Sequence, residues 1–197
     1  GKKEKEGPLG AFFDVSHTDN TLGDVSWEKA ESQLQTEAVE TALKKAALEG
    51  KDVDYILAGD LLNQCISSTF GLRSLGIPFL GQYGACSTMA QTLGLASLFV
   101  ETGIARRAVA VTSSHFCSAE RQFRFPLEYG GQRTPTAQWT ATAAGSVVVG
   151  AHGRGEVKVN AVTFGRIADL GIKDANNMGA AMAPAAAQTL HDYLTDT

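Results

Sequence analysis

The residue with the clearest chemical potential is Cys86, which lies in a run of small residues, 84–88 (GACST), ahead of a strongly apolar stretch. Residues 89–102 are expected to form a helix. A cysteine in the first turn of a helix faces the positive end of the helix dipole and unpaired backbone N–H groups, both of which favour the thiolate. The same N–H groups can receive a carboxylate or an oxyanion. Three interpretations of Cys86 stay open: a nucleophile, part of an anion cradle, or a compact core residue.

A histidine follows the next expected strand. Residues 112–115 (TSSH) come at the end of the buried run 108–112, and α/β sheets place their clefts at the carboxyl ends of strands. His115 is therefore a candidate base or hydrogen-bond donor near Cys86, and the alternative is a histidine satisfied in the interior. His115 and Cys117 have no second pair of ligands nearby, so we expect no metal site.

Residues 119–144 combine arginines with aromatic residues and are expected to form a loop. Guanidinium groups match the geometry of carboxylates, and aromatic rings can enclose a planar ligand. The candidates are Arg121, Arg124, Arg133, Phe123, Phe125 and Tyr129. The alternative is a structural loop whose arginines pair with Glu120 and Glu128 and whose aromatic residues pack in the core or at a dimer contact.

Composition excludes several classes of protein. The chain has 197 residues, and its 17 basic and 21 acidic residues give a net charge of 17 − 21 = −4. With 44% hydrophobic and 19% charged residues it is too apolar to be disordered. Mild acidity argues against a general nucleic-acid binder. The sequence contains neither a span of roughly 18 apolar residues nor the pattern of a signal peptide. Three cysteines without tight spacing indicate a reducing compartment, and Cys65 and Cys117 read as structural thiols.

The pattern predicts an α/β protein. After an irregular lead-in over residues 1–25, helices are expected at 26–49, 61–75, 89–102 and 180–194, with Ser26 as the first N-cap. Strands or extended runs are expected at 53–58, 77–80, 108–112, 145–150 and 156–164. Helices that alternate with strands favour a mostly parallel sheet covered by helices, and segments that are apolar on all sides favour more than two layers.

Six segments together resemble the stage V sporulation protein AD family. They are 58–64 (AGDLLNQ), 84–88 (GACST), 112–115 (TSSH), 119–124 (AERQFR), 128–132 (EYGGQ) and 178–187 (MGAAMAPAAA). The resemblance implies a thiolase-like fold related to ketoacyl synthase III, with layered αβαβα architecture. It places a first half at 26–178 and the start of a truncated second half at 179–197. The helix after Cys86 would lie between two sheets, so one half alone would leave its far face exposed, and the strand at 108–112 would pair across a homodimer.

The resemblance also implies a function. Members of the family are understood as soluble proteins that bind dipicolinic acid. They belong to the machinery that moves dipicolinic acid and calcium into the developing spore. The implied ligand set is Cys86, Ser87 and His115, to which we add Arg121, Arg124 and Arg133 as cations for the two carboxylates. We assign no catalytic residue and expect no cofactor other than calcium held as calcium dipicolinate. The implied place is the cytoplasmic side of the spore, peripheral to its inner membrane, with other stage V sporulation membrane proteins as partners.

Two alternatives stay open. One is acyl transfer, as in a thiolase or ketoacyl synthase III, with Cys86 as the nucleophile. This reaction also needs a base and an oxyanion hole, and the sequence offers no complete set. The other is an interaction module, in which the pocket is vestigial and the protein docks components of a membrane transport complex.

Overall fold

The computed structural model describes residues 1–123, 140–151, 157–174 and 177–196. The chain divides into two compact units, Gly1–Arg154 and Gly155–Thr197. The first holds the whole described sheet, and the second holds one helix, α6 (Met178–Asp196). This helix confirms the one expected at 180–194. The expected division at residue 178 concerns the halves of the family's fold and stays a prediction.

The sheet has four strands in the order β2-β1-β3-β4. β2 (Phe79–Gly81), β1 (Tyr55–Gly59) and β3 (Arg107–Ser114) are parallel, and β4 (Ala143–Gly150) runs antiparallel to β3. The expectation of a mostly parallel sheet is therefore confirmed. β3 is hydrogen-bonded on both sides, to β1 and β4, so the expectation that this strand pairs across a dimer is wrong.

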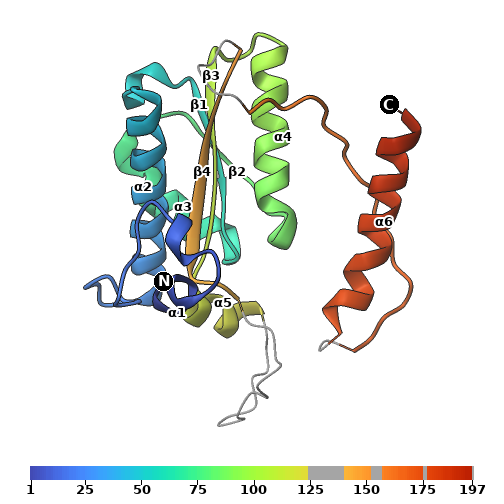
Figure 1. The fold of residues 1–197 in the computed structure, drawn as a ribbon, viewed down its shortest axis with the longest axis horizontal. Helices are drawn as coiled ribbons and strands as arrows, with labels where there is room; N and C mark the ends of the chain where they lie inside the picture. Colours follow the sequence, from blue (N-terminus) through green and yellow to red (C-terminus); the bar gives the residue numbers. More distant parts are fainter. Residues whose placement is uncertain (124–139, 152–156, 175–176, 197) are drawn as a thin grey trace. The chain divides into compact units, whose positions relative to one another are not determined.

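Helices cover both faces of the sheet (Figure 1). Ile56 and Ala58 of β1 pack with α2 (Trp27–Ala46) and α3 (Ile66–Leu72) in one core cluster. Leu57 points to the opposite face and packs with Ala96 of α4 (Thr88–Glu101) in a second cluster. Successive residues of a strand face opposite sides, so β1 supplies both cores. The result is a three-layer α/β/α unit.

The two long helices of this unit begin and end close to the predicted residues. Ser26 caps α2, because its Oγ accepts a hydrogen bond from the N–H of Lys29 at 3.3 Å. α2 ends before residue 49 because Ala47 takes a left-handed conformation with φ 55°. α4 covers 88–101 where 89–102 was expected. Its face on the sheet is buried, whereas Leu98 is 39% exposed.

Four expectations need correction. A short helix, α1 (Lys2–Glu6), lies within the lead-in that was expected to be irregular. The helix expected at 61–75 shortens to α3 because Gln64 and Cys65 adopt positive φ angles of 61° and 50°. The expected loop at 119–144 begins instead inside α5 (Phe116–Phe123), and 124–139 lie outside the described residues. Residues 157–164 form no strand, since no described strand of the second unit is available to pair with them.

Candidate functional site

The candidate site is the sheet edge at which β2, β1 and β3 end. Because these strands are parallel, their carboxyl ends share one edge. The segments that leave them carry Asp60, Cys86 and His115, and α4 and α5 both begin there (Figure 1). The positive end of the α4 dipole faces this edge, while the N–H groups of Ser87 and Thr88 already donate to the Gly84 and Ala85 carbonyls in the turn before α4. Open α/β sheets bind ligands in this position.

Cys86 lies in a 3-10 turn, Ala85–Ser87, that leads into α4. Cys86 is exposed, and Ala85 takes a left-handed conformation with φ 49°. The Ser87 hydroxyl is also exposed and donates to the Gly84 carbonyl at 2.8 Å. Thr88 Oγ1 donates to the Ala85 carbonyl at 2.8 Å and accepts the Gly84 N–H at 3.1 Å. These bonds fix the turn while the thiol stays accessible.

Close packing holds the Cys86 turn against the neighbouring loop. The Gln91 amide donates to Gln82 Oε1 at 2.7 Å, and the Cys65 thiol donates to the Gln82 carbonyl at 3.2 Å. Cys65 is buried, as expected for a structural thiol, and burial raises its pKa. A Cβ at Gly84 would collide with Gln91 Oε1 and with the Ser87 hydroxyl. A larger residue at position 84 would therefore force the Gln91 and Ser87 side chains to move.

His115 is buried, and both of its ring nitrogens are hydrogen-bonded. Nδ1 accepts the N–H of Cys117 at 3.2 Å, which leaves the proton on Nε2, 2.8 Å from the Asn20 carbonyl. The ring also packs against Trp27, with 5.3 Å between ring centroids. Burial lowers the pKa of His115, so the ring is neutral. The structure brings His115 to the same edge as Cys86, but no hydrogen bond joins the two among the described residues.

The predicted arginines are only partly placed. Arg121 lies in α5, which starts at the edge where β3 ends. Arg124 and Arg133 lie outside the described residues, as do Phe125 and Tyr129. Within the described part of the chain, no three histidine, cysteine, aspartate or glutamate side chains are grouped so that they could hold a metal.

A buried polar network that the sequence pattern did not predict lies behind this edge. Glu31 of α2 is fully buried and accepts hydrogen bonds from Ser113 and Ser118, each at 2.9 Å. Burial is the main cause that raises the pKa of Glu31 to about 7, with a further contribution from the negative charge of Asp60. The hydrogen bonds from Ser118 and Ser113 act in the opposite direction. No cation is among the groups that shift its pKa.

Gln35, one turn after Glu31, extends the network to β1 and α3. Its amide nitrogen donates to Ser113 Oγ at 3.0 Å, to Ser68 Oγ at 3.0 Å and to the Gly59 carbonyl at 3.2 Å. Ser68 in turn donates to Asp60 Oδ2 at 2.6 Å. The network therefore links α2, α3, β3 and the loop after β1. The sequence did contain a sign of this network, because two polar residues, Glu31 and Gln35, interrupt the buried stripe of α2 with i, i+4 spacing.

Comparison with known proteins identifies the family. The family described as Stage V sporulation protein AD (SpoVAD) matches residues 1–197. The chain is 48% identical over 196 residues to the Stage V sporulation protein AD of Bacillus subtilis (strain 168). The matched region covers 100% of this chain and 58% of that protein. The chain thus spans somewhat more than half the length of its curated relative.

Solved structures support the fold. 3-Oxoacyl-[acyl-carrier-protein] synthase III from Aquifex aeolicus VF5 has a TM-score of 0.50 and 22% identity, over 64% of this chain and 39% of its own. AbyA1, a tetronic acid condensing enzyme, has a TM-score of 0.51 and 22% identity, over 71% of this chain and 41% of its own. At these identities the likeness concerns the fold alone, and it confirms the thiolase-like class. On the sequence comparisons, the chain belongs to the stage V sporulation protein AD family.

Proposed function

We propose that the protein containing this chain binds dipicolinate, alone or with calcium, and serves its transport into the developing spore. The observation that carries the proposal is the exposed Cys86 turn at the start of α4, in a member of a sporulation family. Dipicolinate is a planar dianion. The positive end of the α4 dipole suits one of its carboxylates.

The proposed ligand set is centred on Cys86 and Ser87. Both are exposed, and no side chain of the described residues caps the start of α4. Arg121, Arg124 and Arg133 are the proposed cations for the carboxylates, since guanidinium groups bind carboxylates through two parallel hydrogen bonds. His115 drops out of the set, because both ring nitrogens already bond the backbone. We assign it the role of holding the segment around Asn20 to the start of α5.

Calorimetric titration of the full-length protein with dipicolinate, with and without calcium, tests the proposal. We expect saturable binding that is weakened at least tenfold by Cys86→Trp, because an indole would fill the space beside the turn. Lys44→Trp is the matched control, since Lys44 is exposed near the end of α2, away from this edge. The absence of binding heat in the folded protein, under both conditions, would contradict the proposal.

Acyl transfer is the second candidate function. It is favoured by an exposed Cys86 on a fold shared with condensing enzymes. In that reaction the thioester C–S bond of an acyl-coenzyme A breaks, the acyl carbon bonds to Cys86 Sγ, and the thiol proton leaves with coenzyme A. Mass spectrometry after incubation with acyl-coenzyme A would detect the acyl group on Cys86. Acylation of Cys86 would favour acyl transfer over dipicolinate binding as the function of the protein.

The place and partners of the protein are part of the same proposal. We propose a homodimer on the cytoplasmic side of the spore, peripheral to the inner membrane, in contact with other stage V sporulation membrane proteins. None of the described helices is both long and apolar enough to span a bilayer. Sedimentation of the full-length protein tests the dimer, and a single monomeric species at micromolar concentration would contradict it.

A further inference from the structure

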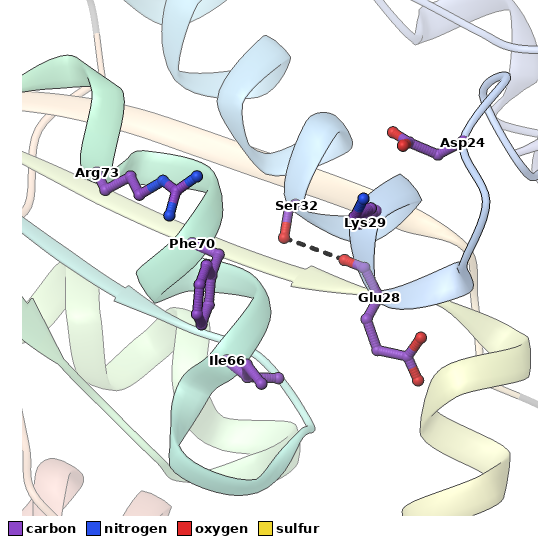
Figure 2. A pocket seen from close by; sticks show the side chains of 7 residues that line it. All are labelled: Asp24, Glu28, Lys29, Ser32, Ile66, Phe70 and Arg73. Carbon is purple, nitrogen blue, oxygen red and sulfur yellow. Dashed lines mark hydrogen bonds between the residues drawn. The ribbon is translucent and has the colours of Figure 1, made fainter.

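A groove lies between the first half of α2 and α3 (Figure 2). Its volume is about 370 Å³. Ile66 and Phe70 supply its apolar wall. They are four residues apart on α3, so they share a side of the helix. They are 39% and 55% exposed, which makes an apolar surface that the described residues of the first unit leave open.

The groove is preformed, because hydrogen bonds lock α3 against α2. Ser32 Oγ donates to the Ser67 carbonyl at 2.9 Å, and Thr36 Oγ1 donates to the Gly71 carbonyl at 2.8 Å. A Cβ at Gly71 would collide with the Ser32 backbone, so glycine permits this close approach. A partner that entered the groove would not have to order its wall, which lowers the entropic cost of binding.

Charges of opposite sign mark the two ends of the groove. The Arg73 guanidinium lies 5.2 Å from the centre of the Phe70 ring, at the α3 end. Asp24 and Glu28 lie across the groove on the α2 side, where Lys29 partly offsets them (Figure 2). The four charges sum to zero. An anionic membrane surface or a small anion would therefore gain little net attraction here.

A polypeptide with both signs of charge matches this pattern. We propose that the α2–α3 groove docks an amphipathic helix of another protein, with apolar side chains on Ile66 and Phe70. One of its acidic residues would face Arg73 and a basic residue would face Asp24. A helix suits this groove, because residues on or next to two helices line it. The charge pattern also fixes the direction in which the helix lies. The inference concerns a partner surface and does not depend on the proposed dipicolinate site.

The test begins with selection of peptides from a random 16-residue display library on the full-length protein, with Phe70→Ala as the counter-selection. We expect enriched peptides to carry apolar residues with helical spacing, between an acidic and a basic residue. Synthetic versions should bind Phe70→Ala at least roughly tenfold more weakly by fluorescence anisotropy. Arg73→Glu should weaken binding by a similar factor, and exchange of the peptide's acidic residue for lysine should restore it. Lys44→Glu is the control, an exposed charge reversal elsewhere on α2.

Several outcomes would overturn the proposal. Peptides that bind Phe70→Ala as tightly as the parent protein would place the site elsewhere, and failure to enrich any peptide would contradict the docking role. Complete protection of Ile66→Cys from labelling in the full-length protein, under conditions in which Lys44→Cys reacts fully, would show that its own chain or a second copy fills the groove, since Ile66 is 39% exposed. Titration of Phe70→Ala with dipicolinate keeps the two proposals apart, because its binding should be unchanged whether or not a peptide docks.

Discussion

Glu31→Gln should remove the contribution of one buried carboxyl to the pH dependence of stability between pH 5 and pH 8. In the folded protein burial raises the pKa of Glu31 from 4.5 to about 7. The folded state therefore holds this proton more tightly than the unfolded state does. The stability from this group is complete below pH 4.5, declines as the pH rises, and is lost above the folded pKa. Glutamine has nearly the same shape and does not titrate.

The magnitude follows from the difference between the two pKa values. One pKa unit corresponds to about 1.4 kcal/mol, so a shift from 4.5 to about 7 amounts to about 3 kcal/mol. Roughly 2–3 kcal/mol of this falls between pH 5 and pH 8. The free energy of unfolding of Glu31→Gln, relative to the parent protein, should therefore rise by that amount across the range.

Urea unfolding of the full-length protein at pH 5, 6, 7 and 8 measures this difference. Glu40→Gln is the control, since Glu40 is an exposed carboxylate on the same helix. The slope against urea should be the same in all proteins if only stability changes. Parallel pH profiles for the parent protein and Glu31→Gln would refute the reasoning, because Glu31 would then ionise as easily in the folded state as in the unfolded one.

Three further substitutions test the account of the site. Ser113→Ala should cost about 1–3 kcal/mol in urea unfolding, because it removes the hydroxyl that joins the buried carboxylate to the neighbouring amide. His115→Phe should lower the unfolding free energy by a similar amount, about 1–3 kcal/mol, through the lost bond to Asn20. In titration it should affect dipicolinate less than Cys86→Trp does, and an equal loss would return the imidazole to the ligand set. Gly84→Ala should weaken dipicolinate binding in calorimetry because its Cβ would push the Ser87 and Gln91 side chains out of their places at the turn, and unchanged affinity would contradict the proposed cradle.

The sequence predicted the parts of the fold in which local and tertiary preferences agree. Ser26 and the apolar stripe after it predicted α2, and the small residues around Cys86 predicted a turn at the start of a helix. The position of Cys86 at the sheet edge followed from the alternation of strands and helices. Because parallel strands end together, their order along the chain was enough to bring Cys86 and His115 to one edge.

The parts of the fold that the sequence did not predict depend on contacts between residues that lie far apart in the chain. Val157 and Val159 have the alternation of a strand, but no strand of the described residues pairs with them, and Val157 is 93% exposed. A loop was expected from residue 119 because the segment is rich in arginine and aromatic residues, yet residues 119–123 belong to α5, which Ser118 anchors through a hydrogen bond to Glu31, 87 residues earlier. Glu31 has an ionisable side chain of the kind usually found on the surface, but it is buried in the fold. Its role appears only when β3 and α5 close over α2.

Protection of Cys86 from iodoacetamide by dipicolinate is the most direct test of the central claim. The full-length protein would be alkylated at increasing dipicolinate concentrations, and each cysteine followed by mass spectrometry. Cys86 is exposed and Cys117 is partly buried, so Cys117 reports general changes in the protein. The account predicts that labelling of Cys86 slows with the same dissociation constant as in calorimetry, while the rate for Cys117 stays constant. Binding heat without protection of Cys86 would contradict it, because the ligand would then lie away from the turn.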